Sequence, residues 1–216
     1  MSWQFVSFLG DSTVLLPSAA VLLIVLFLRA PSRQVACNWA LLFGITGAIV
    51  SASKLAFMGW GIGIREIDFT GFSGHTALSA AFWPIFLWLL FSRATTGVRR
   101  AAIVVGYALA ALVGYSRLMI HAHSTSEVVA GLLLGASGSA LLLLLQSRTS
   151  RAGNVQLSWS GVFSVMMIPV LLLNTGVKAP TQSLLGEIAV KIGPLEKPFT
   201  RADLHKHFID CAKEMR

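Results

Sequence analysis

Long apolar runs, separated by short charged segments, dominate the chain. Six stretches contain no Asp, Glu, Lys or Arg: 12–28, 34–53, 69–92, 101–116, 128–147 and 152–177. A helix needs about 20 apolar residues to cross a bilayer, and most of these stretches meet that length within a few residues. The stretch 101–116 is short, so we extend its helix through Arg117 to about Ile120. The pattern predicts an all-α, polytopic membrane protein with six transmembrane helices in a bundle.

A change in composition divides the chain into a transmembrane domain, 1–177, and a more polar C-terminal tail, 178–216. Two short amphipathic helices are expected in the tail, one before Pro194 and one that begins near Thr200 and Asp203. Their apolar positions are Leu185, Ile188 and Ile192 in the first, and Leu204, Phe208, Cys211 and Met215 in the second. Helices this short cannot span a bilayer, so they rest on the membrane or on the protein. The tail is then either a passive anchor or subunit interface, or a cover that narrows lipid access.

Composition supports a membrane protein and argues against a nucleic-acid-binding one. Hydrophobic residues make up 55% of the 216 positions and charged residues only 12%, whereas soluble domains carry about a quarter charged residues. The net charge of +8 could suggest nucleic acid. However, the arginines form short clusters between apolar runs and do not follow one face. The expected partners are therefore membrane lipids, and no nucleic acid is expected.

The charged loops predict the orientation of the helices. Alternate loops hold seven arginines and no acidic residue: Arg29, Arg33, Arg93, Arg99, Arg100, Arg148 and Arg151. Short basic loops stay in the cytoplasm. Segments 54–75 and 117–127 and both termini are therefore expected on the extracytoplasmic side of the plasma (inner) membrane.

Ser73-Gly74-His75 opens the third predicted helix on that outer side. The first N–H groups of a helix lack intrahelical partners and attract anions. Gly74 removes the side chain that would keep a phosphate from this backbone, and His75 is placed to exchange a proton with a bound group. Alternatively, Ser73 is simply a helix cap and His75 is incidental.

His123 and Glu127 precede and open the fifth predicted helix. A carboxylate four residues after a histidine can hold one ring nitrogen and leave the other free as nucleophile or base. A metal site that uses His121, His123 and Glu127 is the alternative. It would not explain the lysine and arginine expected nearby.

Lys54 and Arg117 lie at or inside the boundaries of predicted spans. Such residues often extend to the interface without further function. Two cations that converge with helix N-termini and two histidines favour a phosphate site. Arg65 either joins this site or is a solvated loop charge.

Together these residues resemble the three motifs of the type 2 phosphatidic acid phosphatase superfamily. The motifs are Lys-x6-Arg-Pro, Pro-Ser-Gly-His and Ser-Arg-x5-His-x3-Asp. The third appears as Ser116-Arg117, His123 and Glu127, and the second as Phe72-Ser73-Gly74-His75. The first is degraded, because Lys54 is followed by Arg65 only after ten intervening residues. The resemblance covers about residues 36–146, with phenylalanine in place of proline and glutamate in place of aspartate.

The resemblance implies a membrane phosphohydrolase that needs no metal or other cofactor. His123 would form a phosphohistidine and Glu127 would orient it, while His75 would protonate the leaving group. Phosphate ligands would be Lys54, Ser73, Gly74, Arg117 and, more weakly, Arg65. Candidate substrates are undecaprenyl diphosphate, phosphatidic acid, phosphatidylglycerophosphate or a lipid A phosphate. A lipid phosphotransferase and a non-catalytic lipid-phosphate binder or transporter remain the alternatives.

Overall fold

A computed structural model describes residues 3–28, 33–147, 161–163, 165–167, 171 and 181–206. Helices account for nearly all of the regular structure in these residues, with one isolated β-bridge between Ile64 and Phe69. The elements are α1 (Trp3–Phe8), α2 (Ser12–Phe27), α3 (Arg33–Trp60), the 3-10 helix η2 (Arg65–Ile67), α4 (Gly74–Leu90), α5 (Thr96–Met119), α6 (Thr125–Ser147) and α8 (Thr181–Ile192).

Within the described residues, four segments are long and apolar enough to cross a membrane: Trp3–Phe27, Arg33–Trp60, Thr96–Met119 and Thr125–Ser147. α4 is equally apolar but shorter. The chain is therefore a multi-pass membrane protein, and the first five predicted spans correspond to α2, α3, α4, α5 and α6. The sixth, 152–177, lies largely outside the described residues, so the count of six stays a prediction.

Helix boundaries differ from the charge-free stretches where a charged residue lies on the helix itself. α3 continues past Lys54 to Trp60, and α5 begins at Thr96 instead of 101. The guanidinium of Arg99 lies 5.1 Å from the ring centre of Trp88, so this charge is accommodated against an aromatic face. α4 begins at Gly74 instead of 69, because Gly71 adopts a φ of +139° that is incompatible with a helix. Glycine is the residue that most readily adopts such a positive φ.

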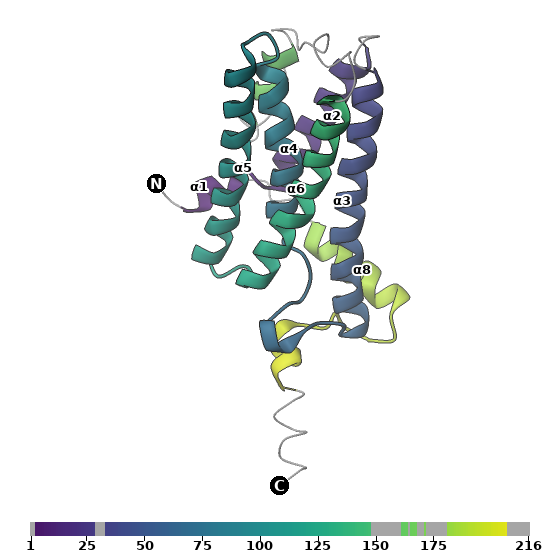
Figure 1. The fold of residues 1–216 in the computed structure, drawn as a ribbon. Coiled ribbons are helices and arrows are strands. Elements are labelled where there is room, and N and C mark those ends of the chain that lie inside the picture. Colours follow the sequence, from purple (N-terminus) through teal and green to yellow (C-terminus); the bar gives the residue numbers. More distant parts are fainter. Residues whose placement is uncertain are drawn as a thin grey trace.

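α4 is the central helix of the bundle and lies among α2, α3, α5 and α6 (Figure 1). Glycines on its neighbours allow close backbone contact. A Cβ added at Gly131 of α6 would lie 2.7 Å from the carbonyl oxygen of Ser73, and one at Gly135 would collide with the carbonyl of Ala77. Any larger residue would force the helices apart. The separation of α4 and α6, which carry His75 and Glu127, is therefore set by backbone contact.

The bundle has two distinct ends. The α4–α5 turn at 91–95 lies at one end, and the segments 61–73 and 120–124 lie near the opposite end together with α8 (Figure 1). Segments far apart in the sequence thus meet at one end of the helices, as the charge pattern predicts. The side of the membrane that this end faces stays a prediction.

The C-terminal segment packs against the end of α3. α8 is a helix, as expected, but its buried residues are Gly186 and Ala189, whereas Ile188 and Ile192 are exposed. Small residues allow this closeness, because a Cβ at Gly59 of α3 would lie 3.2 Å from the carbonyl oxygen of Ala189. The predicted cap that begins the second tail helix is present. Asp203 accepts hydrogen bonds from the backbone N–H and the hydroxyl of Thr200 at 3.0 and 2.6 Å.

Beyond residue 206 the second tail helix lies outside the described residues, and with it the predicted apolar positions Phe208, Cys211 and Met215. The helical turn 201–206 begins where the cap predicts. The full amphipathic helix stays a prediction.

Candidate functional site

His123 and Glu127 form a hydrogen-bonded pair, largely shielded from solvent, at the junction of α5 and α6. The turn between these helices places His121 at a φ of +53° and brings His123 above the first turn of α6. His123 Nδ1 donates to Glu127 Oε2 at 2.6 Å, with 14% of the histidine side chain exposed and none of the glutamate. The bond fixes the proton on Nδ1 and leaves the lone pair on Nε2 for chemistry.

The Glu127 carboxylate is held from several sides. Its Oε2 also accepts from the backbone N–H of Ser124 at 3.2 Å. Its Oε1 accepts from the backbone N–H of Thr70 at 2.9 Å and from the Thr70 hydroxyl. Arg201, from the C-terminal segment, donates to the same oxygen at 2.7 Å. A carboxylate with this many partners stays ionised and oriented, so it can position the imidazole.

Burial is the main influence on the protonation of His123. It lowers the pKa of His123 below its ordinary value, and the positive charges of Lys54 and Arg117 lower that pKa further, while the bond to Glu127 opposes both. The net direction is downward, so the imidazole is neutral at neutral pH. A neutral imidazole is the form that can act as a nucleophile.

His75 is the second residue of α4 and is held by a residue near the start of the chain. Its Nε2 lies 3.3 Å from Asp11 Oδ2. Asp11 caps α2 by accepting from the backbone N–H and hydroxyl of Thr13 at 2.8 and 2.7 Å. Asp11 therefore has a geometry suited to orienting His75. In the sequence, a carboxylate at the start of a helix suggests only a helix cap, so the sequence does not predict that Asp11 belongs to the site.

Ser73 and Gly74 lie at the start of α4, as predicted. Ser73 is fully buried, and its hydroxyl pairs with that of Thr76 at 2.9 Å instead of capping the helix. Its backbone N–H donates to the carbonyl oxygen of Glu127 at 3.1 Å. Gly74 borders the same pocket as His75. Ser73 thus joins the helix that carries His75 to the helix that carries Glu127.

Lys54 and Arg117 reach the same space from α3 and from the last turn of α5. The Arg117 guanidinium donates to the Ser7 hydroxyl of α1 at 2.7 Å. Its Nε is buried and, among the described residues, has no hydrogen-bond partner. The Arg117 side chain also lines the pockets around His123, so its charge is placed to attract an anionic ligand there.

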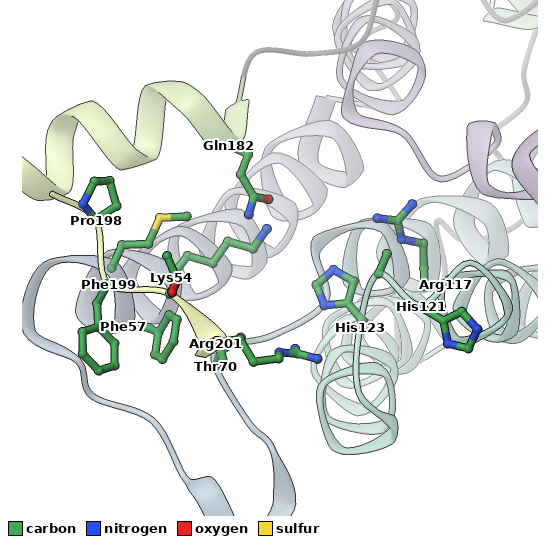
Figure 2. Close-up of a pocket in the computed structure, with 14 residues that line it drawn as sticks. Lys54, Phe57, Thr70, Arg117, His121, His123, Gln182, Pro198, Phe199 and Arg201 are labelled. Atoms are coloured by element: carbon green, nitrogen blue, oxygen red, sulfur yellow. The ribbon is translucent and has the colours of Figure 1, made fainter. Parts of the chain in front are cut away.

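Two pockets meet at these residues. The first has a volume of about 500 Å³ and is polar at its centre, where the side chains of Lys54, Arg117 and Arg201 surround His123 (Figure 2). The second, of about 300 Å³, shares Lys54, Arg117, His123 and Gln182 with the first. The second also includes His75 and continues between α2, α3, α4 and α8 along a largely apolar lining: Leu16, Phe43, Gly44, Gly47, Val50, Leu78 and Leu185.

Two of the residues that the sequence suggested for the site lie away from the pair formed by His123 and Glu127. Arg65 begins η2 and borders neither of these pockets. The side chain of His121 borders the first pocket but points away from His123 (Figure 2). Within the described residues, no group of three or more His, Cys, Asp or Glu side chains could hold a metal ion.

Three residues in or beside the site were not anticipated: Asp11, Thr70 and Arg201. Each reaches a catalytic candidate from a separate segment, and none belongs to a local pattern that indicates catalysis. The C-terminal segment also lines both pockets, through Gln182 in each. That placement is compatible with the cover hypothesis, whose effect on lipid access stays a prediction.

Comparison with known proteins identifies a family whose matched segment contains several of these residues. A model of the PAP2 superfamily matches residues 63–151, which include His75, Arg117, His123 and Glu127 but not Lys54. A Klebsiella pneumoniae protein, described as "Uncharacterized 22.5 kDa protein in cps region", is 70% identical over 206 residues, which cover 95% of this chain and 99% of the relative. No solved structure matches. With its motif residues gathered at one end of a helical membrane bundle, the chain contains a PAP2 superfamily domain at residues 63–151.

Proposed function

We propose that the protein is a membrane phosphohydrolase that removes phosphate from a lipid phosphate or diphosphate. One observation carries the proposal: His123, Lys54 and Arg117 lie where a pocket lined by basic side chains meets a mainly apolar pocket. An amphiphile needs both environments, with its charged headgroup beside the cations and its hydrocarbon chain in the apolar space.

The residues suit a two-step transfer through the enzyme. Nε2 of His123 attacks phosphorus, the phosphorus–oxygen bond to the lipid breaks, and the departing oxygen takes a proton from His75. His75 then accepts a proton from water as that water attacks the phosphohistidine, which releases phosphate and restores His123. Lys54 and Arg117 stabilise the charge on the transferring phosphoryl group. The ion pair with Glu127 stabilises the positive imidazole that forms during the first step.

Phosphate release from a panel of lipid phosphates tests the proposal directly. Purified protein in lipid nanodiscs, with EDTA present, should release phosphate from at least one lipid phosphate or diphosphate. Transfer of the phosphoryl group to an added lipid acceptor, without net phosphate release, would indicate the phosphotransferase alternative. Binding without turnover of any substrate would indicate a lipid-phosphate binder. Activity that disappears in EDTA and returns with zinc would indicate metal chemistry.

The pH dependence of kcat/KM should be bell-shaped. His123 must be neutral to attack and His75 must carry a proton to give. Because the pKa of His123 is lowered, the acidic limb should fall below the ordinary histidine value of 6.5, and activity should decline as the pH drops through that limb. A pH series at limiting substrate measures both limbs of the kcat/KM profile, and a series at saturating substrate gives the corresponding profile of kcat. A flat profile, with chemistry shown to be rate-limiting, would contradict these roles.

The apolar pocket can be tested by filling it. Gly47 of α3 borders this pocket, and a Cβ added there would meet no atom within 4 Å. Gly47→Leu should therefore raise KM for long-chain lipid phosphates while kcat/KM for a short, water-soluble phosphate ester stays close to that of the wild type. Gly97→Leu is the matched control, because Gly97 also faces open space but lies at the far end of the bundle. An equal effect on long and short substrates would remove this pocket from lipid binding.

A further inference from the structure

The first motif lacks its arginine where the spacing would place it. Seven residues after Lys54 stands Gly61, which has a φ of +70°. A Cβ built at this glycine would lie 3.5 Å from the ring of Phe199. The space beside position 61 is therefore covered by the C-terminal segment, and the cation expected there is missing from α3 and its continuation.

The C-terminal segment is anchored at this same place. The backbone N–H of Phe199 donates to the carbonyl oxygen of Met58 at 2.8 Å, which satisfies one of the free carbonyls at the end of α3. The rings of Phe57 and Phe199 meet edge to face, with centres 5.5 Å apart. At the next residue the capping interaction of Thr200 with Asp203 starts a helical turn, which fixes the backbone direction at Arg201.

This anchoring brings the Arg201 guanidinium into the pocket lined by basic side chains. Arg201 Nη2 donates to Glu127 Oε1 at 2.7 Å, and Nη1 forms an ion pair with Asp68 Oδ2 at 3.0 Å. The side chain extends toward His123 from the same side as Lys54, while Arg117 lies on the other side (Figure 2). A guanidinium carries five N–H donors in a fixed fork, and these two ion pairs use one from each terminal nitrogen. With 36% of its side chain exposed, Arg201 can reach a ligand in the pocket.

We propose that Arg201 supplies a third phosphate-binding cation beside Lys54 and Arg117, in place of the arginine that the first motif lacks. Lys54 and Arg201 then bind the phosphate from one side and Arg117 from the other. Planar, bidentate recognition of phosphate is the property that distinguishes arginine from lysine. The C-terminal segment is thus part of the binding site, and it holds Arg201 in place through Asp68 and Glu127 before the ligand arrives. The inference takes phosphate as the ligand and to that extent rests on the proposed function.

Binding of inorganic phosphate to the full-length protein in nanodiscs tests the inference without relying on turnover. Titration calorimetry of Arg201→Ala should show a dissociation constant for phosphate raised by about ten- to a hundredfold, the range expected for a lost charge-assisted hydrogen bond. KM for a hydrolysed lipid phosphate should rise with it. Arg201→Lys should recover part of the affinity, because it keeps the charge but not the fork. Lys197→Ala is the matched control, since it removes an exposed positive charge from the same segment and should leave the constant unchanged.

Several outcomes would overturn the inference. Unchanged phosphate affinity in both Arg201→Ala and Arg201→Gln, each shown by thermal unfolding to be folded, removes Arg201 from phosphate binding. Reduced kcat with unchanged affinity and a displaced acidic limb of the pH profile would make Arg201 a positioning residue for Glu127 alone. A loss of affinity in Arg65→Ala but not in Arg201→Ala would assign the third cation to Arg65.

The inference and the proposed function can fail separately. If the wild-type protein binds phosphate in an Arg201-dependent manner but hydrolyses no lipid phosphate, the inference stands and the hydrolase proposal fails. If hydrolysis occurs with unchanged phosphate binding and KM in the Arg201 variants, the hydrolase proposal stands and the inference fails.

Discussion

Replacement of His123 by alanine is expected to reduce turnover by about four orders of magnitude or more, because removal of a covalent nucleophile closes the pathway instead of slowing it. The imidazole is buried at the meeting point of both pockets, and Glu127 presents its free nitrogen to them. Steady-state phosphate release measures the loss. Brief incubation with a radiolabelled lipid phosphate should label the wild-type protein through an acid-labile bond and leave His123→Ala unlabelled.

His121→Ala provides the matched control for this prediction. It removes the same side chain two positions away, in the same turn, where the ring points away from His123 (Figure 2). This variant should retain most of the activity. If both variants retain substantial activity, the phosphohistidine mechanism is excluded. If both variants lose activity, and added zinc restores part of it in either one, a metal site that uses both histidines becomes the better account.

Glu127→Gln should give the second largest effect, a fall in kcat of about two to four orders of magnitude. The amide keeps the size of the side chain but loses the charge that stabilises the imidazolium. Its NH₂ group would also face one of the donors that the carboxylate now accepts from, either His123 or the pair Thr70 and Arg201. A fully buried side chain has no water to correct this mismatch.

Glu127→Asp is the informative companion variant, because aspartate is the residue in the family motif at this position. It retains the charge but is one methylene shorter, so it should keep more activity than Glu127→Gln and less than the wild type. Circular dichroism and membrane insertion would confirm that each variant is folded. Wild-type kcat in Glu127→Gln would show that the carboxylate neither orients nor stabilises the histidine.

The parts of the fold and site that the sequence predicted depend on short-range patterns. Runs of apolar residues identify helices of bilayer length, and a spacing of four brings His123, just before α6, beside Glu127 in the first turn of that helix. The alternation of crossings then brings Lys54 and Arg117 to the same end of the bundle. Helix boundaries failed where a charge was treated as an end, since Lys54 lies on a helix that continues to Trp60.

The contacts that the sequence did not predict join segments with no shared pattern. Asp11 is recognisable only as a helix cap, and its contact with His75 depends on how α2 packs against α4. Arg201 follows a cap in a polar tail, and only the docking of Phe199 on the end of α3 directs it toward Glu127. Arg65, the next arginine after Lys54 in the sequence, borders neither pocket. Proximity in sequence was a poor guide to proximity in space here.

The residues of the site separate into two groups with different freedom to change. The segment that matches the family, 63–151, contains both histidines, Glu127 and Arg117, and glycine contacts fix the spacing of its helices to within the width of a methyl group. Asp11, Lys54 and Arg201 come from outside that segment. The residues proposed to make and break bonds therefore lie on helices whose spacing is set by backbone contact, whereas three of the charged residues around them come from flanking segments. Changes in those flanks are therefore expected to alter which ligand the site prefers while they leave the proposed chemistry in place.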